Sequence, residues 1–505
     1  MKYTASVLLA SAGLATALIQ QCSSREAVDE GGNWFCGAVD QILYEGIQGK
    51  GSFKAVTEMS DAGECLQKDQ SYGGPLAPLD QDTRHTSCIQ EQHSNTSKLS
   101  VHFRGPLELR QFAVYNLASN QKRNQIDLEV GAARVQGGEV ETGPETSKIS
   151  ARHRHGHRFL HRAQRDKRGD IVTATINGKV VTWENDYFGP TAAPNPVPAP
   201  APKVQAGAGA AAMKDKDADA DTTATTSKKP ADKKPTDKKP TGKKPSGKPA
   251  PSGSDWDRVA YYNAVKQVSE NIVFMGNHGG QGSGVFDTVW GLSLSYLNST
   301  GTGGASSPEI LENILIPSNT EFSIFSAEKC DASCGFSRVP SIAYKGFGGA
   351  NKVFLFEFKM PSDGTRCPAG TRPGSPSCAN PDMPAVWALN AAIPRAAQYK
   401  GCSCWGTGCG ELDIFEVLAP GDSKCKSTFH MANGAGSSDY FKRPTDEYIK
   451  VATVFHEESA SVSIKKLSDN VDFAKGLDDK TVLSWLSRPT DDKALKLSSL
   501  FQLSS

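Results

Sequence analysis

The strongest constraint on the fold is a series of short apolar segments in residues 255–505. Apolar residues alternate with polar ones, or form unbroken runs, at residues 292–296, 321–326, 352–360, 385–389, 427–431, 451–455 and 460–464. A period of two is typical of strands, whereas a helix repeats every 3.6 residues. None of these segments has helical periodicity. We therefore predict an all-β chain in which residues 255–505 form a two-sheet jelly-roll sandwich.

The 505 residues are too many for one typical domain. Residues 21–190 contain further alternating segments, such as residues 98–103, and predict a smaller, disulfide-containing β domain before the sandwich. Within it, β-branched residues flank Asn177-Gly178, a pair that is typical of a two-residue hairpin turn. We expect this hairpin to belong to the N-terminal domain.

The formal net charge of +1 is unevenly distributed. Residues 152–168 and residues 203–248 each carry a net charge of +6, which leaves about −11 for the remainder of the chain. Residues 191–254 are rich in Pro, Ala and Lys and cannot bury a core, so we predict a disordered linker there. Basic charge in segments expected to be unfolded argues against a nucleic-acid-binding domain, which needs it on a folded face.

The basic segment 151–168 also contains four histidines that could bind a metal: His153, His155, His157 and His161. The interleaved arginines would repel a cation, so a solvated basic loop is the simpler interpretation. Lys167-Arg168 alternatively resembles a dibasic processing site of the kexin type.

Several features indicate export. Residues 1–20 contain a basic residue, Lys2, followed by an apolar run, as in a secretory signal peptide. No other stretch is long enough to span a membrane and the C-terminus lacks an apolar tail, so we expect a secreted chain without a membrane anchor. The sequons at Asn95 and Asn298 predict N-glycosylation. Twelve cysteines, four early and eight late, suit an oxidising compartment, and each half could close its own disulfides.

Three carboxylates lie in one six-residue segment, Glu411–Glu416. On a strand, Glu411 and Asp413 share a face, but Glu416 has the wrong parity to join them. One extra residue, as in a β-bulge at Ile414/Phe415, would return Glu416 to that face. Neighbouring like charges are unfavourable, so such a row suggests chemistry or cation binding.

Paired carboxyl groups are what glycoside hydrolysis needs. In retaining enzymes they lie roughly 5–5.5 Å apart, one as nucleophile and one as acid/base. Mutual repulsion separates their pKa values, so that one Glu attacks while the other donates a proton, and Asp413 could orient the nucleophile. There are two alternatives. The three carboxylates could bind Ca²⁺, although the residue pattern of dedicated calcium loops is missing. They could also be an inactive remnant of a catalytic site in a wall protein that only binds glucan.

The segment matches the Glu-x-Asp-x-x-Glu signature of glycoside hydrolase family 16, and the chain resembles the laminarinase-like β-jelly rolls of that family. The resemblance implies that Glu411 is the nucleophile, Asp413 its helper and Glu416 the acid/base. We expect neither a metal nor a cofactor at this site.

Two flanking segments extend the resemblance. Residues 384–389 resemble the Pro-Ala-x-Trp strand of family 16, and residues 428–430 resemble the strand that follows the signature. Trp387 and His430 would then lie in a glycan-binding groove. Only about ninety residues follow Glu416, which is short for this fold, so we expect residues 255–400 to supply much of the sandwich.

Three cysteines crowd the approach to the acidic segment, at Cys402, Cys404 and Cys409. They could bind zinc, but export favours disulfides. Trp405 between them could stack on a sugar or cover the disulfides, and we include it among the candidate substrate-binding residues.

Residues 33–36 and residues 42–46 near the start of the chain, and the Cys-x-Cys-Trp sequence before the acidic segment, carry a second likeness. In both ordered regions, but not in the linker, the chain is similar to a fungal cell-wall family, the secreted β-glucan-active proteins of the Target-of-SBF type. This likeness implies a retaining glycosidase or transglycosylase that acts on β-glucan, with β-1,3 linkages expected, and takes part in cell-wall organisation. Its partners would be β-glucan and the wall matrix. The alternative is a non-catalytic glucan-binding wall protein.

Overall fold

The computed structural model describes residues 27–30, 33–47, 50–73, 98–118, 170–176, 179–185, 254–338, 341–373, 375, 377–399, 401–431, 434 and 436–503. The predictions for the signal peptide, Asn95, the basic loop 151–168 with its cleavage site, and the linker fall outside these residues. The predicted hairpin around Asn177-Gly178 is confirmed: β8 (Asp170–Ile176) pairs antiparallel with β9 (Lys179–Asn185), with Ile176 opposite Lys179.

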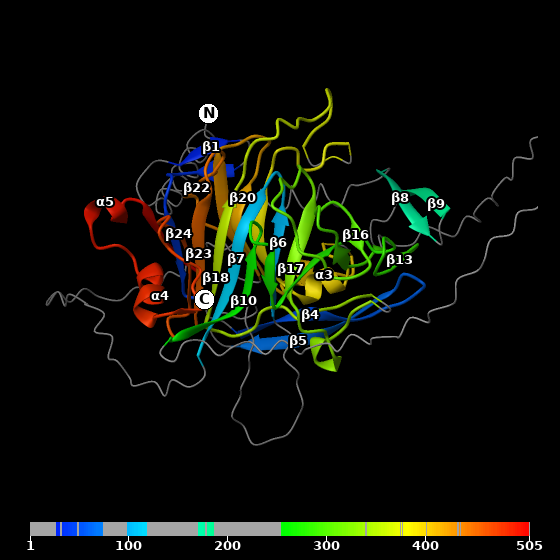
Figure 1. Ribbon diagram of the computed structural model, residues 1–505, viewed down its shortest axis with the longest axis horizontal. Coiled ribbons are helices and arrows are strands. Elements are labelled where there is room, and N and C mark those ends of the chain that lie inside the picture. The colour runs from blue at the N-terminus through cyan, green and yellow to red at the C-terminus, as the bar shows by residue number, and fades with distance from the viewer. Residues whose placement is uncertain are drawn as a thin grey trace, which may run out of the picture. The chain divides into compact units, whose positions relative to one another are not determined.

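The described residues form two large sheets of nine strands each (Figure 1). In spatial order, the first sheet contains β11 (Val268–Glu270), β10 (Trp256–Asn263), β7 (Glu108–Leu117), β18 (Lys352–Lys359), β23 (Ile449–His456), β24 (Ser461–Leu467), β3 (Gln41–Glu45) and β26 (Ser498–Gln502), with β25 (Gly476–Leu477) beside β10.

The second sheet carries the acidic segment. In spatial order it contains β16 (Gly304–Ala305), β15 (Ser295–Leu297), β12 (Ile272–Gly276), β17 (Glu321–Ser326), β6 (Leu99–Arg104), β19 (Ala385–Asn390), β20 (Glu411–Val417), β21 (Lys424–His430) and β22 (Phe441–Lys442).

Smaller elements complete the described part of the fold. Three further strand pairs are β1 (Val28–Glu30) with β2 (Asn33–Phe35), β4 (Lys50–Met59) with β5 (Cys65–Gly73), and β13 (Phe286–Asp287) with β14 (Gly291–Leu292). The helical elements are η1 (Ala332–Cys334), α3 (Ala392–Arg395), η2 (Cys404–Thr407), α4 (Asp479–Leu486) and α5 (Asp492–Leu495). The longest of these, α4, is capped by the preceding residue Asp478, whose side chain accepts a hydrogen bond from the Thr481 amide. No helix in the described ranges is long and apolar enough to cross a membrane.

The two large sheets pack face to face around one apolar core. Phe103 of the second sheet contacts Phe356 of the first with ring centroids 6.3 Å apart, and Phe358 contacts Phe415 at 5.4 Å. On β18 the alternate side chains Val353 and Leu355 are also apolar and pack in a second cluster with Val482 and Trp485 of α4, so both faces of this strand are buried. The prediction of a two-sheet, mostly β fold is thereby confirmed.

The N-terminal strands do not form a separate domain body, which differs from our expectation. β7 lies between β10 and β18 in the first sheet, and β6 lies between β17 and β19 in the second (Figure 1). Each is therefore an interior strand of a sheet otherwise built largely from residues after 254. The region after Glu416 is too short to complete the sandwich, and the N-terminal region supplies part of the missing strands.

Among the described cysteines, four disulfides close: Cys65–Cys402, Cys330–Cys334, Cys367–Cys378 and Cys404–Cys409. The Cys65–Cys402 bond crosses between the two halves of the chain, so closure of all disulfides within each half, which the cysteine counts allowed, does not occur. Cys425 is a free, buried thiol in the core. The disulfide interpretation of Cys402, Cys404 and Cys409 is confirmed.

Candidate active site

The β-bulge predicted in the acidic segment is present. Asp413 pairs with Thr428 and Glu416 pairs with Lys426, so Ile414 and Phe415 together oppose one residue of β21. The register against β19 shifts at the same place. Leu412, Ile414, Phe415 and Val417 pack into the core between the sheets, and the three carboxylates consequently share the outer face of the second sheet.

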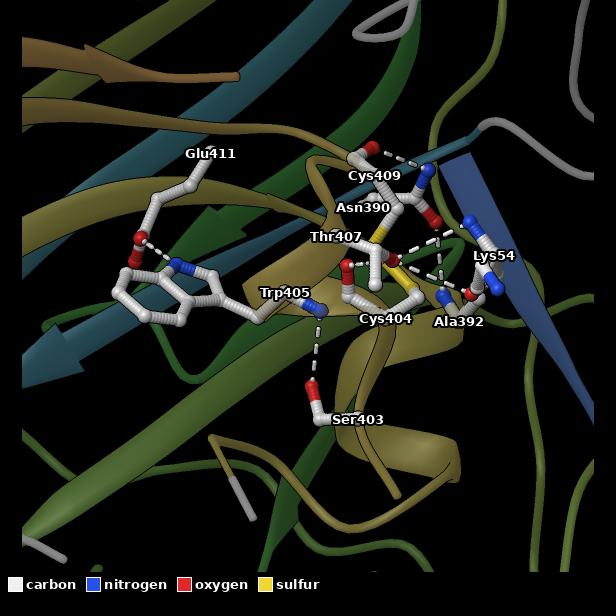
Figure 2. The surroundings of a disulfide bond; sticks show 9 residues. All are labelled: Lys54, Asn390, Ala392, Ser403, Cys404, Trp405, Thr407, Cys409 and Glu411. Carbon is white, nitrogen blue, oxygen red and sulfur yellow. Dashed lines mark hydrogen bonds between the residues drawn. A yellow bond between two sulfur atoms is a disulfide. The ribbon is translucent and has the colours of Figure 1, made fainter. Parts of the chain in front are cut away.

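Glu411 is held at both carboxylate oxygens by neutral donors from one loop. The Tyr399 hydroxyl donates to Oε1 at 2.5 Å. The Trp405 indole N–H donates to Oε2, as Figure 2 shows. Only 1% of Glu411 is exposed. Burial, followed by the nearby charge of Asp413, raises the pKa of Glu411 to about 8, while His430 and the two hydrogen bonds oppose this rise.

Asp413 lies between the two glutamates. Burial raises the pKa of Asp413 well above its ordinary value, the charge of Glu416 adds to the rise, and Arg104 opposes it. A hydrogen bond between the Asp413 and Glu416 side chains, which forms when one of the two carboxyls holds a proton, contributes to the same rise. On its other side, Asp413 Oδ2 lies 2.9 Å from His430 Nε2. The cluster can therefore store and share a proton.

Glu416 has a cation as its neighbour. Arg104 Nη2 donates to Glu416 Oε1 at 3.2 Å, and both side chains are almost fully buried. A charge-assisted bond of this kind is stronger than a neutral one. The two glutamates of one strand thus have different electrostatic surroundings.

Trp387 is more enclosed than a sugar-stacking residue would need to be. It is 3% exposed, and its ring stacks on His102 with centroids 5.3 Å apart. Phe53 of β4 belongs to the same apolar cluster on this face. Burial lowers the pKa of His102 to about 3, so this imidazole is neutral at physiological pH. Trp387 therefore lies beneath the site, packed against protein.

Trp405 and His430 lie at the more open side of the cluster. Their rings are 5.8 Å apart, and the His430 side chain is 17% exposed. Trp405 donates to Glu411 directly and also packs in one apolar cluster with Cys404 and Cys409, while its stacking on a sugar stays a prediction. A ligand that approaches the carboxylates would meet these two side chains.

The loop that carries Tyr399 and Trp405 is braced from the N-terminal hairpin. Cys65 of β5 is bonded to Cys402, and the Thr407 hydroxyl bridges the backbone N–H and C=O of Lys54 at 3.2 Å each (Figure 2). The Cys404–Cys409 disulfide closes the η2 turn around Trp405. Ala397 and Tyr399 have φ angles of 84° and 55°, which non-glycine residues rarely adopt. Tertiary bonds thus fix an unfavourable backbone that presents Tyr399 to Glu411.

Glu411, Asp413 and His430 bring one ligand atom each within 4.8 Å of one another, a spacing that a cation could bridge. The hydrogen bonds described above already engage all three groups, so we assign them no metal role. Of the predicted glycosylation sites, Asn298 lies partly exposed in the turn after β15, where its Oδ1 accepts from the Thr302 amide.

Three groups near the carboxylates were missed from the sequence: Arg104, Tyr399 and Lys426. Arg104 had a usable signal, because Ser100, His102 and Arg104 alternate with apolar residues and define a polar face. What the alternation does not reveal is which strand that face lies beside. Tyr399, in an irregular loop, had no signal.

Fold and site together define a two-sheet β protein with a buried cluster of interacting carboxyls on the outer face of one sheet. The chain belongs to the YJL171C/Tos1 family of cell wall proteins. Residues 254–485 match the family described as "Cell wall protein YJL171C/Tos1, C-terminal", and residues 40–85 and 95–117 match its N-terminal counterpart. The expected cell-wall family is thereby confirmed.

Relatives cover nearly the full chain. A Candida albicans protein named "Probable circularly permuted 1,3-beta-glucanase TOS1" is 37% identical over 96% of this chain and 98% of its own length. A Saccharomyces cerevisiae protein of the same name is 36% identical over 92% and 94%. An Arthroderma benhamiae protein named "Probable circularly permuted 1,3-beta-glucanase" is 35% identical over 92% and 93%. No solved structure matches this chain.

Proposed function

We propose that this protein is a secreted retaining glycosidase or transglycosylase that acts on the β-1,3-glucan of the fungal cell wall. The observation that carries the proposal is the bulged strand β20, which brings three buried carboxyls to one face with different partners at its two ends. The names of the relatives support the substrate class.

In the proposed reaction, Glu411 attacks the anomeric carbon while Glu416 gives its proton to the departing glycosidic oxygen. The glycosyl-enzyme is then released when water or a sugar hydroxyl displaces Glu411 and gives a proton to Glu416. Asp413, between them, exchanges a hydrogen bond with Glu416 and shares the proton load. Water as acceptor gives hydrolysis, and a sugar hydroxyl gives transglycosylation.

The glycan would approach over Trp405 and His430, with Trp387 supporting the site from below. We further propose that the sandwich is a family 16 jelly roll in which the chain order is circularly permuted. The interior positions of β6 and β7 support this, because N-terminal strands then occupy places that the C-terminal region leaves open.

The test is turnover of laminari-oligosaccharides by the full-length secreted protein, with the anomer of the first product followed by NMR. We expect shorter or longer β-1,3-linked products that initially retain the β configuration, and their loss in Glu411→Gln. Normal retention on insoluble β-glucan without any turnover by the wild type would instead favour the non-catalytic glucan-binding alternative.

A further inference from the structure

Charged side chains form a row of alternating sign across the outer face of the second sheet. The register aligns Glu321 of β17 with Arg104 of β6, and Glu416 of β20 with Lys426 of β21. Between Arg104 and Glu416 lies Ala385 of β19, which pairs with both. Because the alanine side chain is small, Arg104 can reach across it to Glu416 Oε1, 3.2 Å away.

The Arg104 guanidinium is fixed on its other edge by the backbone. Its Nε donates to the Met383 carbonyl at 2.8 Å, and Nη1 lies 3.8 Å from Glu321 Oε1. The arginine side chain is almost fully buried, with 6% exposed. A planar guanidinium bonded along one edge presents its remaining N–H groups in a defined direction.

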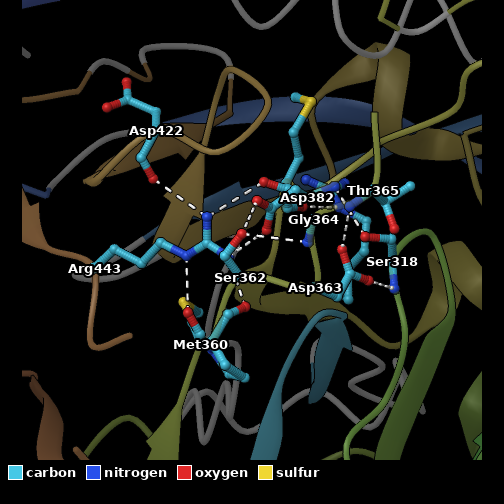
Figure 3. A network of polar contacts seen from close by, with 12 residues as sticks. Ser318, Met360, Ser362, Asp363, Gly364, Thr365, Asp382, Asp422 and Arg443 are labelled. Atoms are coloured by element: carbon cyan, nitrogen blue, oxygen red, sulfur yellow. Dashed lines mark hydrogen bonds and ion pairs between the residues drawn. The ribbon is translucent and has the colours of Figure 1, made fainter. Parts of the chain in front are cut away.

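A second buried arginine stabilises the loop that carries Met383. Arg443 donates to Asp382 Oδ1 at 2.5 Å and to the Met360 carbonyl at 2.8 Å (Figure 3). Asp382 has a φ of 49°, which non-glycine residues rarely adopt. This network fixes the residue directly before Met383, and hence the carbonyl that orients Arg104.

We propose that Arg104 is a positioning residue for Glu416, an inference that rests on the glycosidase proposed above. Arg104 orients the acid/base carboxyl through a charge-assisted hydrogen bond to its Oε1, and Asp413 lies next to that carboxyl on the same strand face. Glu416 must be protonated in the first half of the reaction and ionised in the second. A group placed between a cation and a neighbouring acid can pass between these forms at one pH.

The charged and titratable groups around Glu416 come from four strands: Arg104 on β6, Glu321 on β17, Asp413 on β20 itself, and Lys426 and, from the core side, Cys425 on β21. β19 presents the uncharged Ala385 and Trp387 to this row. Arg104 is the cation that contacts the Glu416 carboxylate directly at 3.2 Å.

The experiment measures kcat/KM against pH with two substrates. An aryl β-laminarioside with a good leaving group needs no general acid, so the rate in its pH profile changes where Glu411 gains or loses its proton; we call this part of the profile the Glu411 limb. Laminari-oligosaccharides need both groups, and the second sloping part of their profile, the Glu416 limb, reports the proton of Glu416. We expect Arg104→Gln to move the Glu416 limb to higher pH by about one unit, since an adjacent cation typically shifts a carboxyl by one to three. The Glu411 limb should stay in place.

Two further variants separate this role from a structural one. Ala385→Val fills the space over which Arg104 reaches, and should move the same limb in the same direction by a smaller amount without removing a charge. Arg338→Gln removes a different buried arginine, which bonds the carbonyls of Trp290 and Gly291, and should leave both limbs unchanged. If Arg104→Gln fails to fold, Ala385→Val carries the test.

The proposal is overturned if the Glu416 limb stays in place in Arg104→Gln, or in Ala385→Val where that variant carries the test. A loss of overall rate or thermal stability with an unchanged profile would mean that Arg104 is only structural. The proposed function fails differently: the wild-type protein would then turn over neither substrate, and no profile would exist to compare.

Discussion

The two ends of the acidic strand present the same side chain in opposite surroundings. At one end, Glu411 is bonded by the neutral donors Tyr399 and Trp405, which come from a disulfide-braced loop. At the other, Glu416 is bonded by the cation Arg104, which comes from an interior strand of the same sheet. Neutral donors leave the effect of burial largely uncompensated, and the pKa of Glu411 is accordingly raised to about 8.

Strand β20 determines where the two glutamates lie, whereas neighbouring segments determine which groups each glutamate contacts. The bulged strand places both glutamates on one face, but it does not by itself give two side chains of the same type different acidity. The difference between the two glutamates comes from residues remote in sequence, Tyr399 on one side and Arg104 on the other. Experiments that alter one end while sparing the other are therefore the most informative.

The largest expected effect comes from removing each carboxylate in turn. Glu411→Gln should lower turnover of every substrate by about a thousandfold or more, because the covalent step is lost. Glu416→Gln should lower turnover of laminari-oligosaccharides by about 10²- to 10⁴-fold, yet affect glycosylation by an activated aryl laminarioside far less. The measurements are steady-state rates and the burst of released aryl alcohol. Equal losses for both variants on both substrates would contradict the assignment of roles.

The local part of this site could be predicted from the sequence. Like charges on one strand implied a shared face, the parity of Glu416 then required an extra residue, and the bulge lies at Ile414/Phe415 as expected. Period-two alternation likewise identified most long strands, including the segment that contains β6. Such inferences depend only on neighbours within a few residues.

The non-local part could not be predicted, for a physical reason. Alternation shows that β6 has a polar face, but many partners could pair with that strand, and its place beside β19 depends on the packing of the whole sandwich. An even number of cysteines in each half is compatible with closure within halves, yet Cys65 bonds to Cys402, 337 residues away. We therefore misjudged the N-terminal region as a separate domain.

Removing the Cys65–Cys402 disulfide should disturb the groups that hold Glu411 and leave those that hold Glu416 in place. In Cys65→Ser/Cys402→Ser the loop that presents Tyr399 and Trp405 loses its covalent tie, and we expect kcat to fall by about tenfold or more, because small misplacements at a reacting centre are costly. Loss of such a bond typically costs about 2–4 kcal/mol of unfolding free energy. Thermal unfolding and kcat are measured together at a temperature where the variant is folded.

The matched control is Cys367→Ser/Cys378→Ser, which removes a disulfide that spans only 11 residues and does not join the loop of Tyr399. It should lower stability while keeping the Glu411 limb of the pH profile in place. If the brace variant lost stability but kept its kcat and its Glu411 limb, the loop would not need the disulfide to hold Glu411.

Removing the Tyr399 hydroxyl should disturb the surroundings of Glu411 less than removing the disulfide does. Tyr399→Phe removes a donor that lowers the pKa of Glu411, so that pKa should rise further above about 8. Because Glu411 must be ionised to attack, the Glu411 limb, located with the activated substrate, should move to higher pH by a few tenths of a unit to about one unit. The Glu416 limb should stay in place. Movement of both limbs by equal amounts would mean that the two ends are not independent.

The smallest effect on turnover is expected at Lys426, which faces Glu416 across the register between β20 and β21. Its Nζ donates to the Trp34 carbonyl at 3.0 Å and lies 5.3 Å from the ring of Phe35. Burial lowers the pKa of Lys426 to about 7, with the charge of Asp439 opposing the fall. The group is therefore only partly charged near neutral pH, and Lys426→Met should move the Glu416 limb upward by no more than a few tenths of a unit.

Its effect on stability should instead depend on pH. The pKa of Lys426 is about 7 in the folded protein and returns to its ordinary, higher value on unfolding, so between these values the unfolded chain binds a proton that the folded chain lacks. Stability contributed by this group therefore rises as pH increases through that window. Urea unfolding at pH 7 and at pH 9.5 should show the wild type gaining stability relative to Lys426→Met at the higher pH. An equal change in both proteins would show that Lys426 keeps its ordinary proton affinity, and that the Glu416 end contains two full cations instead of one.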